Sequence, residues 1–220
     1  MSLQTLSTQT AGGTSTGSTP PSRGSEVGTG NTAPAGAVVL RQPRIADGTR
    51  IWEIAKDSQV LDVNSSYAYL LWCRDFAASS VVAEVDGKVV GFVTGYLRPE
   101  SPSTLFVWQV AVDDDQRGRG LGVAMLDHLV GSLAASVDNE EADNKEVENE
   151  TPLGSGVREL ETTVSPDNTA SVAMFASLAR RRGAQMTKSS LFEPDMFPDS
   201  HAAEDLYHIA PIARNTERDH

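Results

Sequence analysis

The stretch that decides the fold is residues 110–124, Val-Ala-Val-Asp-Asp-Asp-Gln-Arg-Gly-Arg-Gly-Leu-Gly-Val-Ala. It follows an apolar run from Leu105 to Val112 that is typical of a strand, and residues 121–133 then repeat apolar side chains at helical spacing. A strand that turns into a helix through glycines presents unpaired backbone N–H groups and the positive end of the helix dipole. This pattern predicts an anion site that suits a pyrophosphate.

The glycines alone, Gly118-x-Gly120-x-Gly122, do not distinguish a phosphate site from a flexible turn. A dinucleotide-binding fold would carry them after the first strand of a βαβ unit, with an acidic residue about 20 positions later. Here they follow several strands in mid-chain, and no Gly-Lys-Ser/Thr follows as it would in a P-loop. Both of those nucleotide-binding folds are therefore excluded.

The residues before this stretch predict a strand, two helices and a hairpin. Val38 to Arg41 is a short apolar run, and helical spacing is found within 47–58 and 65–76, the second with Asn64 or Ser65 as N-cap. Two β-branched runs are divided by Asp86-Gly87, a strong hairpin signal.

The residues after it add strands at 158–164, 185–192 and 206–212 and a helix at 167–182 that Gly183 closes. The expected order is therefore β-α-α-β-β-β-α-β-α-β-β.

The 220-residue chain is expected to hold one domain, residues 37–213, with an acidic loop insertion at about 137–156 and a tail at 214–220. Residues 1–36 contain 24 Ser, Thr, Gly or Pro and are expected to be a disordered leader. They lack the apolar core of a signal peptide, and no run approaches the length of a membrane span. Half of the net charge of −12 lies in residues 138–150.

Composition also narrows the partners and cofactors. An acidic chain argues against general nucleic-acid binding, which requires a basic face. Cys73 is the only cysteine, so an intrachain disulfide and a thiolate metal cluster are excluded and a reducing cytoplasm is expected. The four histidines show no zinc-like spacing, and we expect no metal, no nucleic acid and no membrane partner.

Arg117-x-x-Gly120-x-Gly122 resembles the acetyl-CoA pyrophosphate loop of the GNAT acetyltransferases. Further segments make the resemblance narrower, to the L-2,4-diaminobutyrate N-acetyltransferases of ectoine biosynthesis. These segments are 62–69, the Phe-Val-Trp-Gln-Val-Ala-Val run at 106–112, 160–171 with Asn168, and Glu204-Asp-Leu-Tyr-His-Ile. The resemblance covers roughly residues 38–212.

The resemblance implies an α/β (α+β) GNAT fold, with a mostly antiparallel mixed sheet of six to seven strands flanked by about four helices. The fourth and fifth strands splay apart, and the pantetheine arm of acetyl-CoA lies in the gap, where the amide of Val110 polarises the thioester carbonyl. The residues expected to contact the coenzyme are Val110, Ala111, Val112, Arg117, Gly118, Arg119, Gly120, Leu121, Gly122 and Asn168.

The resemblance also implies that the chain acetylates the 4-amine of L-2,4-diaminobutyrate, an early step towards an osmolyte. An alkyl amine with a pKa of about 10 must lose a proton before it attacks. Glu161 is expected either to take that proton or only to pair with the substrate ammonium or an arginine. Phe175 stands where many GNAT enzymes have a tyrosine that protonates the thiolate of coenzyme A. We therefore expect either that bound water protonates this thiolate or that it leaves unassisted.

The acceptor's charged groups need partners, and we expect Asp62, Glu161 and Trp108 to bind its ammonium groups, Tyr67 to offer a hydroxyl and His201 to meet its carboxylate. Each has a plainer interpretation: Asp62 as a turn or cap, Tyr67 and Trp108 as packing, His201 as an exposed side chain. Two other functions stay open, acetylation of another amine such as a polyamine or protein terminus, and a non-catalytic acyl-CoA-binding regulator. The family resemblance further implies a homodimer.

Overall fold

A seven-stranded sheet organises residues 36–135, 156–199 and 201–212, the residues that this computed structural model describes. The strands, in spatial order, are β1 (Val38–Arg41), β2 (Val81–Val85), β3 (Lys88–Arg98), β4 (Ser101–Val112), β5 (Glu159–Val164), β7 (Glu204–Ala210) and β6 (Gln185–Phe192). Neighbours run antiparallel except β4 and β5, which are parallel. The predicted mixed, mostly antiparallel sheet is confirmed.

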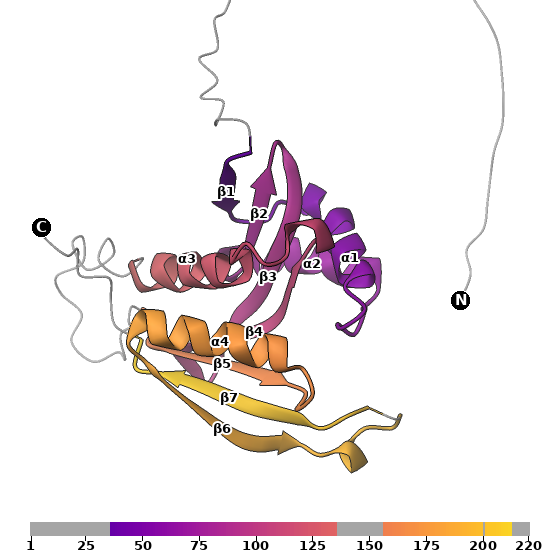
Figure 1. The fold of residues 1–220 in the computed structure, drawn as a ribbon. Helices are drawn as coiled ribbons and strands as arrows, with labels where there is room; N and C mark the ends of the chain where they lie inside the picture. Colours follow the sequence, from indigo (N-terminus) through magenta and orange to yellow (C-terminus); the bar gives the residue numbers. More distant parts are fainter. Residues whose placement is uncertain (1–35, 136–155, 200, 213–220) are drawn as a thin grey trace, which may run out of the picture. The chain divides into compact units, whose positions relative to one another are not determined.

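Helices cover both faces of the sheet (Figure 1). They are α1 (Gly48–Asp57), α2 (Ser66–Asp75), α3 (Leu121–Ala135) and α4 (Thr169–Arg182). The larger core packs α3 and α4 against one face, around side chains such as Leu105, Leu126 and Leu178. A second core packs α1 and α2 against the other face, with Ile54 and Phe92 fully buried. One-turn 3₁₀ helices occupy the loops at Ile45–Asp47, Ala77–Ser79, Asp114–Gln116 and Pro194–Met196.

Local sequence signals set the ends of these elements. The Ser65 hydroxyl accepts a hydrogen bond from the amide of Ala68 and caps α2, as predicted. Asp86 and Gly87 both have positive φ, the conformation that a tight β2–β3 hairpin requires. Gly183, in the left-handed region, ends α4. The predicted order of strands and helices is confirmed.

The last strand differs from its predicted bounds of 206–212. β7 begins at Glu204 and ends at Ala210, because Pro211 has no N–H to donate to a neighbouring strand. This shift matters for the site, since it places Glu204 at the start of a strand. The leader, the acidic insertion and the tail lie outside the described residues, apart from their boundary positions.

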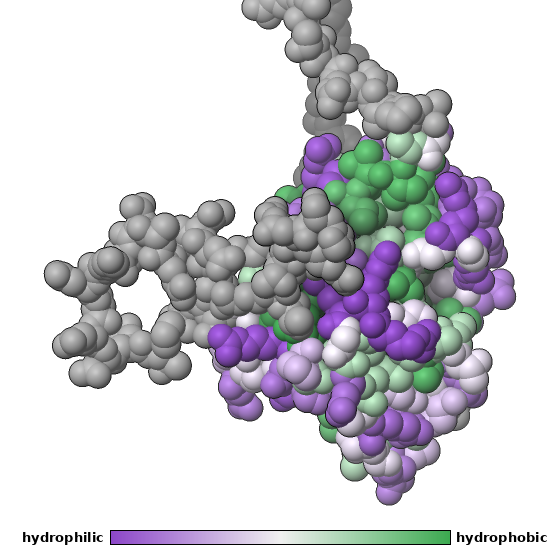
Figure 2. Space-filling view, turned by 60° about the vertical axis from the view of Figure 1, so that its left-hand side comes forward, coloured by the Kyte–Doolittle hydropathy of each residue, from purple (hydrophilic) through white to green (hydrophobic). Residues whose placement is uncertain are grey.

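Hydrophobic side chains that remain at the surface gather in one area of the face drawn in Figure 2, above a band of hydrophilic residues. The edge strand β1 exposes both Val38 and Val39. Within the described ranges, no helix is long and apolar enough to cross a bilayer.

Candidate functional site

The parallel strands β4 and β5 separate part-way along their length. Their pairing runs from Thr104 opposite Glu159 to Val107 opposite Thr162 and ends there, while β4 continues to Val112. The Thr162 hydroxyl donates to the Val107 carbonyl oxygen at 3.0 Å, at the last paired position. The predicted splay is therefore present.

Two cavities meet at this splay, one of about 270 Å³ and one of about 490 Å³. They have in common the lining residues Val60, Val110, Asn168, Ser171 and Met174. The two cavities are therefore adjacent, and Val110 lies at their junction.

The larger cavity is formed by the glycine-rich loop, the start of α3 and one face of α4. Gly118 and Gly120 have φ values of 75° and 74°, which other residues rarely adopt. A Cβ on Gly122 would lie 2.5 Å from the Met174 sulfur, so any larger residue there would require the Met174 side chain to move. Of the predicted coenzyme residues, those that line this cavity are Val110, Ala111, Val112, Arg117, Gly118, Gly120, Leu121, Gly122 and Asn168.

The beginning of the glycine-rich loop is anchored by Arg50 of α1. Its guanidinium holds both carboxylate oxygens of Asp113, at 2.6 and 2.5 Å, and also donates to the Val89 carbonyl oxygen at 3.1 Å. Within the loop Arg117 pairs with Asp114 at 2.8 Å, and Arg119 donates to the Gln116 side chain and is outside the cavity lining. Two of the three consecutive aspartates are thus neutralised beside a site expected to bind an anion.

The smaller cavity gathers side chains from three separate segments. Asp62 comes from the α1–α2 loop, Trp108 from β4, and His201 and Glu204 from the end of the β6–β7 connection and β7. The Asp62 carboxylate lies 2.8 Å from Nε2 of His201, whose ring stacks on Phe197 at 4.2 Å. The structure therefore brings Asp62, Trp108 and His201 together, as predicted.

A buried glutamine, not predicted from the sequence, positions the Asp62 segment. Gln109 accepts a hydrogen bond from the Tyr69 hydroxyl at 3.1 Å and donates to the Asp62 carbonyl oxygen at 2.9 Å. Trp108 stacks on Trp72 of α2 with ring centroids 4.4 Å apart. The packing between α2 and the sheet thus fixes the cavity wall. These contacts join residues that are distant in the sequence, so local sequence patterns do not predict them.

Glu204 is a second residue of the cavity to which sequence reasoning gave no role. Burial raises the pKa of its carboxyl, and a hydrogen bond from Thr163 and the nearby His201 act against that rise. The sequence feature that could have identified Glu204 is the alternation of residues 204–210, which is typical of a strand and places Glu204 on the same side as Leu206 and His208. A carboxyl group with a raised pKa in a cavity is suited to proton transfer.

Two predicted acceptor residues lie elsewhere. Glu161 pairs with Arg98 at 2.7 Å and is outside both cavity linings, so of its two expected roles the ion pair with an arginine is the one present. Tyr67 is 65% exposed at the start of α2 and also lines neither cavity. Phe175 is buried and lines the smaller cavity, so no phenolic hydroxyl is available at its position.

Asn168 lies where both cavities meet and also caps α4, because its side-chain oxygen accepts from the Ser171 amide at 3.1 Å. Its amide nitrogen is therefore the atom available to donate to a ligand.

Burial raises the pKa of the Cys73 thiol to about 11, which makes it a poor nucleophile. Among the residues with described positions, no group of three potential ligands suits a metal ion.

Comparison with known proteins identifies this arrangement. Residues 48–143 match the acetyltransferase (GNAT) family. An L-2,4-diaminobutyric acid acetyltransferase of Nocardia farcinica is 58% identical over 81% of this chain and 83% of its own. One from Streptomyces coelicolor is 49% identical over 83% of this chain and 98% of its own.

A solved structure supports the same relationship. The diaminobutyrate acetyltransferase EctA from Paenibacillus lautus, in complex with its substrate L-2,4-diaminobutyric acid and coenzyme A, has a TM-score of 0.68 and 36% identity. The similarity covers 82% of this chain and 99% of that protein. This chain therefore belongs to the L-2,4-diaminobutyric acid acetyltransferases of the GNAT superfamily.

Proposed function

We propose that this chain transfers the acetyl group of acetyl-CoA to the 4-amine of L-2,4-diaminobutyrate, giving N4-acetyl-L-2,4-diaminobutyrate and CoA in ectoine biosynthesis. The observation that carries the proposal is the meeting of two cavities at the β4–β5 splay, one beside a glycine-rich anion loop and one lined by carboxylates and an indole. The names of the relatives, and the ligands in the Paenibacillus lautus structure, support the same reaction.

In this proposal acetyl-CoA occupies the larger cavity. The amides of residues 117–122 hold its pyrophosphate at the start of α3, and Asn168 donates to the pantetheine arm. The arm then passes Val110, one of the residues common to both cavities, where a backbone amide stabilises the oxyanion of the tetrahedral intermediate.

The diamine occupies the smaller cavity, with Asp62 binding an ammonium group, Trp108 offering its ring face and His201 meeting the α-carboxylate. Glu204, whose pKa is raised by burial, accepts the proton of the reacting ammonium directly or through water. The freed amine attacks the thioester carbonyl carbon, and the intermediate collapses with loss of the thiolate. The nitrogen, positively charged after the attack, releases its second proton to water, and because Phe175 cannot donate a proton, water delivers one to the thiolate.

The reaction is tested by measuring thiol release from acetyl-CoA with L-2,4-diaminobutyrate, ornithine, lysine, spermidine or no acceptor, and by locating the acetylated nitrogen by NMR. We expect a preference for diaminobutyrate and an N4 product. Turnover only with another amine would retain the acetyltransfer and reject the substrate, whereas CoA binding without turnover would favour a regulator.

The proposal also includes a homodimer in the cytoplasm. The family resemblance supports the dimer, and a single buried cysteine is compatible with a reducing compartment. Light scattering of the purified chain is expected to give twice its 23.5 kDa mass, and cell fractionation is expected to recover it with soluble cytoplasmic enzymes.

A further inference from the structure

The larger cavity extends along α4 past Met174, the residue that packs against the anion loop. Its lining on α4 runs from Asn168, at the junction with the acceptor cavity, to Ser177. Gly122, in the anion loop, packs against Met174 in the middle of this range. Ser177 is three residues after Met174, which is slightly less than one helical turn and about 4.5 Å along the helix axis. The Ser177 end of the cavity therefore lies almost one helical turn beyond the contact with the anion loop.

The arginines around this cavity differ in their partners. Arg117 pairs with Asp114, and both Arg181 and Arg182 pair with Asp127 of α3. Arg119 and Arg180 contact neutral oxygens instead: Arg119 donates to the Gln116 side chain within the glycine-rich loop, and Nη2 of Arg180 donates to the Ser177 hydroxyl at 2.8 Å. A phosphate would have to displace a carboxylate from the first three arginines, but only a neutral oxygen from Arg119 or Arg180, and of these two Arg180 is the one that contacts the Ser177 end of the cavity.

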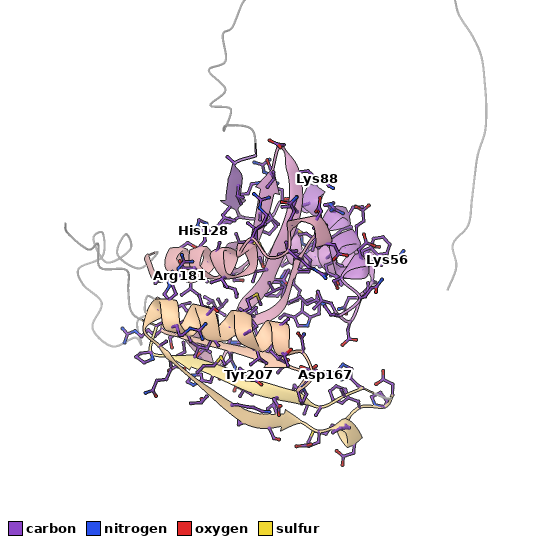
Figure 3. The ribbon with its side chains drawn as sticks, in the orientation of Figure 1. Lys56, Lys88, His128, Asp167, Arg181 and Tyr207 are labelled. Atoms are coloured by element: carbon purple, nitrogen blue, oxygen red, sulfur yellow. The ribbon has the colours of Figure 1, made fainter. Side chains whose placement is uncertain are left out.

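The Arg180 side chain does not itself line the cavity, but its direction brings its charge to Ser177, which does. Side chains on a helix lean towards its N-terminus, and the contact with Ser177 shows that Arg180 does so. Figure 3 labels its neighbour Arg181 near one end of α4 and Asp167 beside the other. The guanidinium of Arg180 points back from the Arg181 end to Ser177, which lines the larger cavity. Arg180 itself is exposed, so its cation is open to a ligand from solvent.

We propose that Arg180 binds the ribose 3′-phosphate of coenzyme A, and that the chain for this reason selects acetyl-CoA over its 3′-dephospho form. CoA carries this third phosphate beyond the pyrophosphate, on the side away from pantetheine, which corresponds to the Ser177 end of the cavity. A terminal phosphate dianion pairs with a planar guanidinium through two hydrogen bonds, and the Ser177 hydroxyl, once released, donates a further one. The inference rests on the placement of the coenzyme in the proposed function.

The test compares the binding of two ligands to the unmodified chain and to a variant at Arg180. Dissociation constants of CoA and of 3′-dephospho-CoA are measured by calorimetry for the full chain and for Arg180→Gln. We expect the unmodified chain to bind CoA about tenfold more tightly than 3′-dephospho-CoA, the size of effect typical of a charge-assisted contact. Arg180→Gln should lose most of that preference, with little change in its affinity for 3′-dephospho-CoA, and Arg180→Lys should retain part of it.

The matched control is Arg74→Gln, which removes another exposed arginine, from α2, where it pairs with Asp75. It should leave the preference unchanged, which separates a local contact from the loss of one positive charge. Equal affinity of the unmodified chain for the two ligands, or equal weakening of both by Arg180→Gln, overturns the inference while leaving acetyl transfer intact. Failure of the unmodified chain to bind either ligand overturns the proposed function as well.

Discussion

The coenzyme side of the cleft is built mainly from one continuous segment, residues 110–123, with the first turns of α4 opposite it. The acceptor side is assembled from a loop at 60–64, the end of β4, and the β6–β7 connection. Asp62 and His201, which meet at 2.8 Å, are 139 residues apart in the sequence. The first side depends on local chain conformation, and the second depends on the whole sheet being in register.

The two sides also use different chemical groups. The coenzyme side offers backbone amides, whose positions depend on glycine conformations and on the Arg50–Asp113 anchor. The acceptor side offers side chains, each with its own protonation state and partner. Substitutions that preserve the fold should therefore disable the acceptor side one function at a time, whereas the coenzyme side should respond to changes of backbone or charge.

The largest effect is expected from Glu204→Gln. If Glu204 takes the proton of the reacting ammonium, kcat should fall about 100-fold or more, with a much smaller change in the KM for diaminobutyrate. The matched control is Glu161→Gln, which removes a carboxylate that pairs with Arg98 outside the cavity. A similar loss of kcat in both variants would contradict the division of roles between the two glutamates.

The pH dependence tests the same assignment. Burial raises the pKa of Glu204, and a base acts only when deprotonated, so kcat/KM should rise with pH through a value above that of an ordinary glutamate. In Glu204→Gln this acidic limb of the profile should be absent. An unchanged limb would assign it to another group, such as His201, whose pKa is raised chiefly by its hydrogen bond with the Ala202 carbonyl and also by Asp62.

The position of Glu161 shows which part of the site the sequence does not predict. Glu161 and Thr163 lie on the same side of β5, two residues apart, so the alternation of side chains along the strand does not tell which of them reaches the cavity. Two residues shift a side chain by about 7 Å along a strand, which places Thr163 at the cavity and Glu161 beside Arg98. Register across β4, β5 and β7 decides the difference, and register depends on contacts distant in the sequence.

The glycine-rich loop was predictable for the opposite reason. Its strand end, turn and helix start follow one another within residues 105–133, so the local pattern contains the whole anion site. The Asp86-Gly87 hairpin and the Ser65 cap were predictable in the same way. The insertion of β7 between β5 and β6 has no such local signal, because it is decided by pairing along three strands.

On the coenzyme side, Gly120→Asp should weaken acetyl-CoA binding about 100-fold, since a carboxylate beside the pyrophosphate costs several kcal/mol. An added Cβ at Gly120 meets no atom within 4 Å, but the φ of 74° strains any side chain placed there, so the control must carry the same strain. Gly87→Asp is the matched control, with φ 78° and equally open space in the β2–β3 hairpin. Calorimetric titration with CoA compares the two, and retained affinity in Gly120→Asp would falsify the pyrophosphate assignment.

A smaller effect, limited to the acceptor, is expected from Asp62→Asn. Loss of one charge-assisted contact with an ammonium group should raise the KM for diaminobutyrate roughly tenfold. The KM for acetyl-CoA should stay within about twofold, because Asp62 lines only the smaller cavity. Steady-state kinetics with each substrate varied in turn measures both values, and a joint rise would mean that the Asp62–His201 contact supports the whole cleft.

Tyr67→Phe should have the smallest effect, because the ring is 65% exposed at the start of α2 and its hydroxyl has no place in either cavity lining. Both KM values and kcat should stay within about twofold of the unmodified chain, since exposed substitutions rarely change free energies by more than about 0.5 kcal/mol. The comparison is with Tyr69→Phe, which removes the buried hydroxyl that holds Gln109. That variant should raise the KM for diaminobutyrate, because Gln109 in turn holds the Asp62 segment. If Tyr67→Phe instead raised this KM, the α1–α2 loop would have to close over the acceptor when the substrate binds.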